Sequence, residues 1–465
     1  MSAKAAAGAR PHAVAPADRV PLATKFYYAL PGMPLQAMGF AALAILPTYY
    51  ATHTQVTLTE IGVVLLATRI FDAVVHPLVG YVSDLTLGRV GRKSWVVAGA
   101  CLTALAAFFL FTPPETAGAT YFTFWSVMLY AAWTVLEVPH RAWGSELSRD
   151  YHERSRIFAV LGQVRLVGAI LFLGVPLLPA FASSDITQPA VLFYAGVGVA
   201  IVFPLTALIA ALLVPEGRRV ATEPSTLIGL LRSVAGNKPF WIFLAVFALS
   251  GIGIGLYNSV LLLFVRDYLK IGPEYPYLAV LYFAVSLPMV GVWGWAMNRM
   301  GKHRAWALGL GAFALLLPVY WIVPAGPDAV PYAIVLTVLI AITSSAQFVA
   351  PLALLGDIVD FDILKTRVNR SGNYFALLQL AQTAEIAIGG GIGFLLLGWF
   401  GYTPKAENGP EAIFGLKLTF LLLPAILYLL SAFLVLFLPI TAKRHATIRK
   451  ALRRRAEREK TESAS

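Results

Sequence analysis

Three ionisable side chains stand close together inside one apolar stretch of the chain. Arg69, Asp72 and His76 follow one another at spacings of three and four residues, so a helix places them on one face. An ionisable group in hydrocarbon costs at least about 2.5 kcal/mol on insertion scales, and such groups therefore mark protein-lined or water-filled cavities. The alternative is a structural Arg–Asp pair that only joins helices. The spacing thus predicts a polar cavity or an internal ion pair.

The composition indicates a membrane protein with many spans. Of 465 residues, 58% are hydrophobic and 13% are charged, which exceeds the apolar content of ordinary soluble domains. The net charge of +12 lies in short turns and in the tail, a topology signal rather than a nucleic-acid-binding patch. The single cysteine, Cys101, excludes an intramolecular disulfide framework and a cysteine-cluster metal site. We expect no cofactor and no nucleic-acid partner.

Twelve apolar stretches reach the length of about 20 residues that a spanning helix needs. Because their number is even, both ends of the chain lie on the same side of the membrane. Lys and Arg gather in alternate turns, which predicts that these turns and both termini face the cytoplasm. We expect a monomer in the inner membrane, without a cleavable signal peptide. The expected helices are 23–51, 58–86, 94–113, 120–146, 155–182, 189–215, 239–266, 275–298, 303–324, 330–359, 370–400 and 411–440.

The longest internal connection follows the sixth helix and divides the chain into two bundles. The expected organisation is a cytoplasmic tail at 1–22, bundles at 23–215 and 239–440 joined by a cytoplasmic loop at 216–238, and a basic tail at 441–465. We expect this basic tail to be a solvated helix that fixes the topology, with contact to anionic lipid as the alternative.

The two bundles show weak internal similarity. After the second helix comes a basic turn in which Asp84 precedes Arg92, and after the eighth comes one in which Asn298 precedes Arg304. Two six-helix repeats around a central site are the plan of the major facilitator superfamily. We expect each of these two pairs to act as a gate that holds the cytoplasmic side closed. Helix packing without a switching role is the alternative.

Several longer motifs mark both halves of the chain. They are Arg69-xx-Asp72-Ala73-xxx-Pro77-xx-Gly80-xxx-Asp84-x-Thr86, Gly91-Arg92-Lys93-x-Trp95, Glu137-Val-Pro139, Arg165, Gly356-Asp-Ile-Val-Asp-Phe-Asp362 and Asn369-Arg-Ser-Gly372. Together they resemble the glycoside-pentoside-hexuronide:cation symporters, the family of the melibiose permease. The resemblance spans nearly the whole chain. It implies an all-α membrane protein with the major facilitator fold, twelve transmembrane helices in two six-helix halves.

The resemblance also implies roles for particular residues. Asp72 matches the cation-site carboxylate of the second helix, Glu137 the sugar-binding acid of the fourth helix, and Arg165 the arginine beside it. A carboxylate and an arginine can each bind two sugar hydroxyls at once, and a purely structural Glu–Arg pair is the alternative. Tyr257 and Tyr374 lie beside polar residues and are candidates for stacking on a sugar ring.

Departures from the family pattern bear on the coupling ion. His76 stands where sodium-using members carry a second aspartate, and Gln36 and Thr383 stand where an acid and a lysine are expected. Neutral imidazole is a poor sodium ligand, whereas it titrates near physiological pH, and its titration is coupled to that of Asp72 one turn away. We therefore expect proton coupling, with Arg69 taking over the carboxylate when His76 is neutral. A fixed hydrogen bond in a uniporter is the alternative.

Glu385 is an acid that the family pattern does not call for. It precedes the run Gly389-Gly-Gly391, which permits close approach of another helix. The residue is either a second protonation site or a hydrogen-bonded carboxylic acid kept neutral by burial.

The expected function is secondary active transport of a sugar-like solute by alternating access, driven by a proton. A lysolipid or another amphiphile is the alternative cargo, because animal relatives of the family carry such molecules. A sensor that binds without transport is a third possibility. An enzyme is not expected, because the sequence holds no metal cluster, nucleotide-binding loop or nucleophile motif.

Overall fold

The computed structural model describes residues 19–148, 150–178, 186–217, 227–368 and 370–439, together with residues 444, 445, 447, 448, 450, 451 and 454 of the basic tail. Within these residues the chain is helical and contains no β-strand. Parts of the expected segments lie outside the described residues: the N-terminal tail up to residue 18, residues 179–182 of the fifth expected helix, residues 218–226 of the central loop, and the rest of the basic tail.

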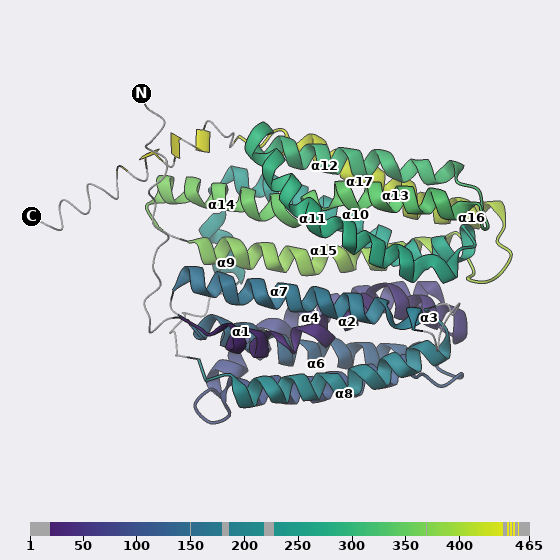
Figure 1. Ribbon diagram of the computed structural model, residues 1–465, viewed down its shortest axis with the longest axis horizontal. Helices are drawn as coiled ribbons and strands as arrows, with labels where there is room; N and C mark the ends of the chain where they lie inside the picture. The colour runs from purple at the N-terminus through teal and green to yellow at the C-terminus, as the bar shows by residue number, and fades with distance from the viewer. Residues whose placement is uncertain are drawn as a thin grey trace, which may run out of the picture.

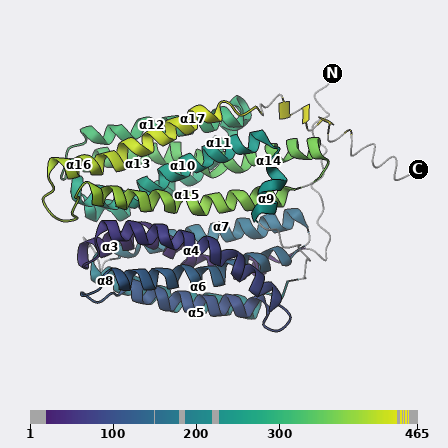
Figure 2. The ribbon, with the colours of Figure 1, turned by 180° about the vertical axis from the view of Figure 1, so that it is seen from behind.

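Helices from the two halves of the chain form two layers that lie side by side (Figures 1 and 2). The first layer holds α1 (Leu22–Ala29), α2 (Gly32–Phe40), the π-helical segment η2 (Ala41–Ile45), α3 (Leu46–His53), α4 (Leu58–Leu85), α5 (Gly91–Phe111), α6 (Ala119–Glu146), α7 (Tyr151–Leu173), the 3-10 turn η3 (Val175–Leu177) and α8 (Pro189–Leu213).

The second layer follows the short helix α9 (Leu227–Val234), which packs against α15. Its members are α10 (Lys238–Leu263), η5 (Phe264–Tyr268), η6 (Gly272–Glu274), α11 (Tyr275–Met300), α12 (Lys302–Leu316), η7 (Leu317–Ile322), α13 (Ala329–Ser344), α14 (Ala346–Thr366), α15 (Ser371–Trp399), α16 (Pro410–Lys417), η8 (Leu418–Leu422) and α17 (Leu423–Val435).

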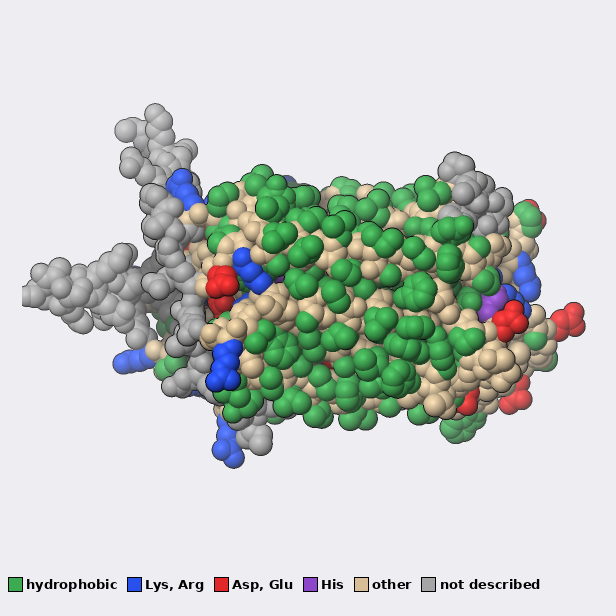
Figure 3. Space-filling view, turned by 90° about the horizontal axis from the view of Figure 1, so that it is seen from below, with side chains coloured by type: hydrophobic (Ala, Val, Ile, Leu, Met, Phe, Trp, Pro, Cys, Tyr) green, Lys and Arg blue, Asp and Glu red, His purple; other side chains and the backbone are tan. Residues whose placement is uncertain are grey.

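Ten helical segments of the described chain are long and apolar enough to cross a membrane. A bent pair, Leu22–Leu43 with Leu46–His53, forms one more crossing with an angle of 44° between its parts. The 28 residues of α4 span about 42 Å at a rise of about 1.5 Å per residue, which completes twelve. Hydrophobic side chains cover the middle of the molecule, and charged side chains gather towards its two ends (Figure 3).

The structure differs from the expected helix boundaries in three places. The fifth expected helix, 155–182, ends at Leu173, because Gly174 and Pro176 open a 3-10 turn. The tenth, 330–359, is divided into α13 and α14 around Ser345 and continues to Thr366. The central loop at 216–238 contains α9, which the sequence did not indicate.

The start of α4 fixes the register of the Arg69–Asp72–His76 stripe. Thr57 caps this helix by accepting a hydrogen bond from the backbone N–H of Glu60, and the Glu60 side chain accepts one from the backbone N–H of Thr57. Such a capping box satisfies two backbone donors that a helix start leaves free. The polar stripe therefore lies in the middle of a helix whose first residue is well defined.

A buried ion pair fixes α1 against α7. Lys25 Nζ contacts Glu153 Oε1, and the backbone N–H of Val20 donates to the same oxygen at 3.1 Å. Burial raises the pKa of the Glu153 carboxyl, but the hydrogen bonds from Lys25 and Val20 outweigh it and lower the pKa below its usual range. Glu153 is thus ionised and holds α1 against the first turn of α7.

Glycines let α15 approach two other helices closely. A Cβ atom on Gly389 would lie 2.2 Å from the carbonyl oxygen of Ile252 in α10, and one on Gly391 would lie 2.6 Å from Leu66 Cγ in α4. Real Cβ atoms do not approach other atoms this closely. Hence α15 joins its own half to the first half through backbone surfaces that tolerate no side chain.

Contacts between the two halves lie at the middle and at one end of the molecule. We call the end with the basic turns at 86–90 and 367–370 the basic end, and the other the opposite end. Phe40 meets Phe283 edge to face with ring centres 5.6 Å apart. Within the described chain, hydrogen bonds cross between the halves at the opposite end: Arg266 donates to Thr187 at 3.5 Å, and Lys405 Nζ lies 3.0 Å from His53 Nε2. The halves are therefore fastened together at the opposite end.

The close approach of α15 gives a test of the fold. Gly389→Ala should lower the melting temperature of the detergent-solubilised protein, because overpacking a closely packed interface costs about 1–3 kcal/mol. Gly372→Ala on the same helix is the control, since a Cβ atom there meets nothing within 4 Å. Equal melting temperatures for the two variants would contradict the proposed packing.

Candidate functional site

The Arg69–Asp72–His76 stripe packs against α6. Asp72 Oδ1 accepts a hydrogen bond from Thr134 Oγ1 at 2.8 Å and lies 2.9 Å from His76 Nδ1. Arg69 Nη1 is 3.8 Å from Asp72 Oδ2, and its guanidinium carbon lies 4.2 Å from the ring centre of Tyr130. The three side chains singled out by their spacing therefore meet, together with two α6 residues that the sequence analysis did not name.

Asp72 and His76 differ in the exposed fraction of their side chains. The side chain of Asp72 is 8% exposed and that of His76 is 36% exposed. An imidazole at this depth is costly against lipid hydrocarbon, so its exposed part must face space enclosed by protein or filled with water. His76 is thus the more exposed member of this pair, and Asp72 is the buried one.

Glu137 is surrounded by hydrogen-bond donors. Its Oε1 accepts from Arg165 Nη2 at 2.8 Å and from Arg141 Nη2 and Nε at 2.7 and 3.0 Å. Its Oε2 accepts from the indole nitrogen of Trp133 at 2.6 Å. Glu137 and Arg165, named from the sequence, are therefore in contact, and Arg141 completes an Arg–Glu–Arg triad that pairwise reasoning did not anticipate.

The spacing along the sequence already relates Thr134 and Arg141 to Glu137. Thr134 and Arg141 lie three and four residues from Glu137, so all three share one face of α6. A polar stripe on this helix, matched against the stripe on α4, would have indicated both.

The two tyrosines expected to bind a sugar lie inside the second half. Tyr257 is 7% exposed and stacks on Phe420 with ring centres 4.9 Å apart. Tyr374 is fully buried, and its hydroxyl accepts a hydrogen bond from Asn237 at 2.9 Å. Neither ring is open to a solute in this conformation, because packing and hydrogen bonding already occupy both. The structure therefore does not favour a binding role for them.

Glu385 is buried between α15 and α10. A Cβ atom on Gly251 of α10 would lie 1.8 Å from Glu385 Cδ, so the absent side chain of Gly251 makes the space that the carboxyl fills. Its Oε2 has no hydrogen-bond partner among the described residues. Glu385 thus lies in the second half, apart from the charged groups on α4, α6 and α7.

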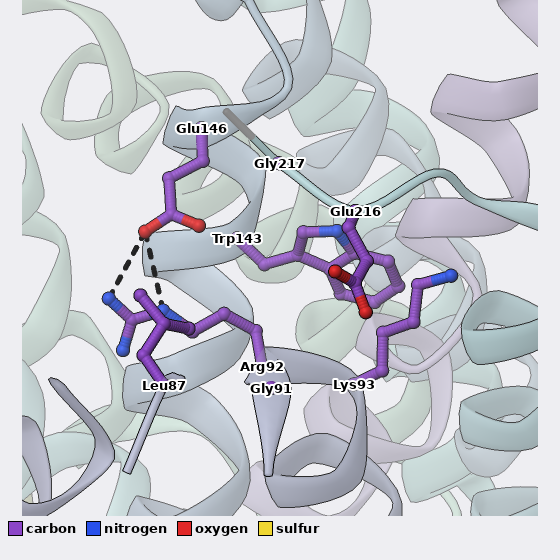
Figure 4. A pocket seen from close by; sticks show the side chains of 8 residues that line it. All are labelled: Leu87, Gly91, Arg92, Lys93, Trp143, Glu146, Glu216 and Gly217. Carbon is purple, nitrogen blue, oxygen red and sulfur yellow. Dashed lines mark hydrogen bonds and ion pairs between the residues drawn. The ribbon is translucent and has the colours of Figure 1, made fainter. Parts of the chain in front are cut away.

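Arg92 joins three elements at the basic end. Its guanidinium contacts Asp84 Oδ1, as the sequence predicted, and also donates to Ser83 Oγ at 3.0 Å. Nη2 and Nε lie 3.1 and 3.3 Å from Glu146 Oε1 at the end of α6 (Figure 4). The side chain of Asp84 is 66% exposed and that of Glu146 is 9% exposed. Glu146 is therefore the buried partner of Arg92.

The corresponding pair in the second half is a different one. No hydrogen bond or ion pair joins Asn298 to Arg304 within the described chain, and both side chains are exposed. Instead Lys302 Nζ donates to Asp357 Oδ1 at 2.6 Å, and His445 of the basic tail lies 3.2 Å from the same oxygen. Lys302 is the first residue of α12, and Arg92 likewise lies in the first turn of α5, whereas Asp357 lies in the middle of α14 and Glu146 is the last residue of α6. The expected pair is therefore corrected to Lys302 and Asp357.

Metal binding finds no support among the described residues, which contain no group of three His, Cys, Asp or Glu side chains that would hold a metal ion.

The chain is similar to known proteins over most of its length. A family model described as MFS/sugar transport protein matches residues 27–442. The chain belongs to this family. Its relatives are symporters, so it is a multi-pass membrane transporter and not an enzyme, and the predicted major facilitator fold is confirmed.

Two relatives illustrate the range of the family. The sodium-dependent lysophosphatidylcholine symporter 1 of Mus musculus is 24% identical, with 94% of this chain and 89% of that protein covered. The uncharacterized symporter YjmB of Bacillus subtilis (strain 168) is 22% identical, with 86% and 88% covered.

Solved structures show the same fold at low identity. The nucleoside transporter NupG matches with a TM-score of 0.64 and 14% identity, over 89% of this chain and 98% of its own. The D-xylose-proton symporter matches with a TM-score of 0.62 and 14% identity, over 89% and 97%.

The Arg–Glu–Arg triad predicts a strong asymmetry between single and double variants. Glu137→Gln leaves two guanidinium groups without their carboxylate, and breaking a buried pair costs about 3–5 kcal/mol. The double variant Glu137→Gln/Arg165→Gln should be less destabilised, as measured by thermal unfolding. Glu407→Gln, at an exposed loop position, is the control. A double variant less stable than Glu137→Gln would show that the triad is not the source of the effect.

The difference in burial predicts that Glu146 contributes more to transport through Arg92 than Asp84 does. Glu146→Gln should lower the transport rate in proteoliposomes more than Asp84→Asn does, because the exposed Asp84 pair is screened by solvent. Equal rates for both variants, measured at equal protein density, would contradict this order.

Proposed function

We propose that the chain is a proton-coupled symporter that moves a sugar-like solute across the inner membrane by alternating access, with both termini in the cytoplasm. The observation that carries this proposal is the Arg141–Glu137–Arg165 triad in the middle of an apolar helix bundle. The side chains of Glu137, Arg165 and Arg141 are 12%, 18% and 39% exposed. Charged groups with such partial exposure inside a membrane domain mark a solute pathway.

The proton is the favoured coupling ion because of what surrounds Asp72. A sodium ion prefers several hard oxygen ligands, whereas Asp72 meets one hydroxyl, one imidazole and one guanidinium. An imidazole that is itself part-exposed can take up a proton and pass its effect to the buried carboxylate. Some relatives are named sodium-dependent. We base the proposed difference in coupling ion on His76.

The arrangement of the halves supports an alternating-access cycle. Hydrogen bonds from Arg266 and Lys405 fasten the opposite end, and Arg92 and Lys302 each pair with a carboxylate of their own half at the basic end. Opening of the opposite end requires the first set to break. We propose that the charged groups at the basic end then form contacts between the halves.

Glu385 is proposed as a second protonation site. The residue is 5% exposed, and its Oε2 is unpaired within the described chain; burial without a cation favours an acid that carries its proton. In this proposal the residue exchanges a proton only when α10 and α15 move apart.

A lysolipid is the second candidate cargo. The match to the lysophosphatidylcholine symporter covers 94% of this chain, and the α14 face carries Phe348 and Leu352, which are 53% and 55% exposed. These two residues lie four apart and share one face of the helix, a surface suited to an acyl chain.

Proton coupling is tested in proteoliposomes that enclose a pH-sensitive dye. Addition of a transported solute, found by screening sugars, uronates and lysolipids, should acidify the lumen, and an inward proton gradient should drive accumulation while sodium adds nothing. His76→Ala should abolish the proton signal, because the exposed titrating group is lost. Sodium-driven uptake by the unaltered protein would overturn the proposal. Accumulation that ignores both gradients would identify a uniporter.

A further inference from the structure

Glu137 has little capacity left to accept hydrogen bonds from a solute. Its Oε1 already receives three N–H groups, two from Arg141 and one from Arg165, and its Oε2 receives the Trp133 indole. A carboxylate offers about four acceptor positions in all. Glu137 therefore orients the two arginines rather than receiving sugar hydroxyls.

Hydrogen-bond donors are in excess around this carboxylate. A guanidinium carries five N–H donors, and Arg165 uses Nη2 on Glu137 while its Nε is buried without a partner in the described chain. The Nε of Arg69, one helix away, is also buried and unpaired. A buried donor without an acceptor is costly, so the protein's own acceptors around this carboxylate are fewer than the N–H donors that meet there.

The charges of the triad also favour a ligand that accepts hydrogen bonds and carries negative charge. Two guanidinium groups face one carboxylate in the triad, and the neighbouring Asp72 is already matched by Arg69. The site thus has a net positive charge. Arg141 is the most exposed member, with 39% of its side chain accessible, and is therefore the group that an entering solute meets.

We infer that Arg141 and Arg165 form a binding site for the carboxylate or phosphate group of an anionic solute, and that Arg141 sets this preference. Guanidinium groups bind such anions through paired, charge-assisted hydrogen bonds. The inference rests on the proposed transport function and narrows its substrate class. The anion belongs either to a sugar acid or to a lysophospholipid headgroup.

Equilibrium binding without any gradient tests this inference. Purified protein in nanodiscs is titrated with two matched pairs of probes, methyl glucuronide with methyl glucoside and lysophosphatidylglycerol with monoacylglycerol, and thermal stabilisation is recorded. At least one anionic probe should bind about 10-fold or more tightly than its neutral partner, because hydrogen bonds to charged groups are the stronger ones. The pair that responds identifies the source of the anion.

Arg141→Gln should reduce the anionic-to-neutral affinity ratio by about 10-fold or more, and Arg141→Lys should keep part of it. Arg299→Gln, at an exposed position over Trp295, should leave the ratio unchanged. An Arg141→Gln variant with the original ratio, or a protein that binds no anionic probe more tightly than its neutral partner, would overturn the inference. Proton-driven uptake of a neutral sugar in that case would leave the proposed function intact.

Discussion

Compensation of charge inside an apolar bundle is the constraint on which this structure depends. Asp72 and Glu137 lie on α4 and α6, and each is matched by an arginine, Arg69 and Arg165 respectively. An unmatched charge at that depth would cost several kcal/mol. The positions of α4, α6 and α7 relative to one another are therefore restricted to those in which every carboxylate meets its partners.

The second half is built on a different principle. Its core is aromatic, with Tyr257 and Phe264 both stacked on Phe420, and its helices approach through glycines such as Gly255 and Gly389. Such packing gives a rigid unit with few internal charges. The ion-paired groups on α4, α6 and α7 accordingly lie in the first half, whereas the second half contributes the buried carboxyl of Glu385.

Much of the fold was predictable from the sequence, because twelve apolar stretches and alternating basic turns are strong signals. The stripe on α4 was predictable from spacing alone. The burial of Tyr374 was not, because its hydroxyl is satisfied by Asn237, 137 residues away in the chain. The Lys302–Asp357 pair was likewise hidden, since it joins the start of α12 to the middle of α14, which only the folded bundle brings together.

The proposed proton site on α4 and the proposed solute site both contact α6, and this contact suggests how they would communicate. Thr134 donates to Asp72, and Glu137, one turn later on α6, holds the two arginines. In the proposed function, a change in the charge of the Asp72–His76 pair would alter the hydrogen bond at Thr134 and so act on α6. The same helix ends at Glu146 against Arg92. In the proposed function, protonation, solute binding and the contact at the basic end would thus all act on α6, so no longer pathway is needed to link them.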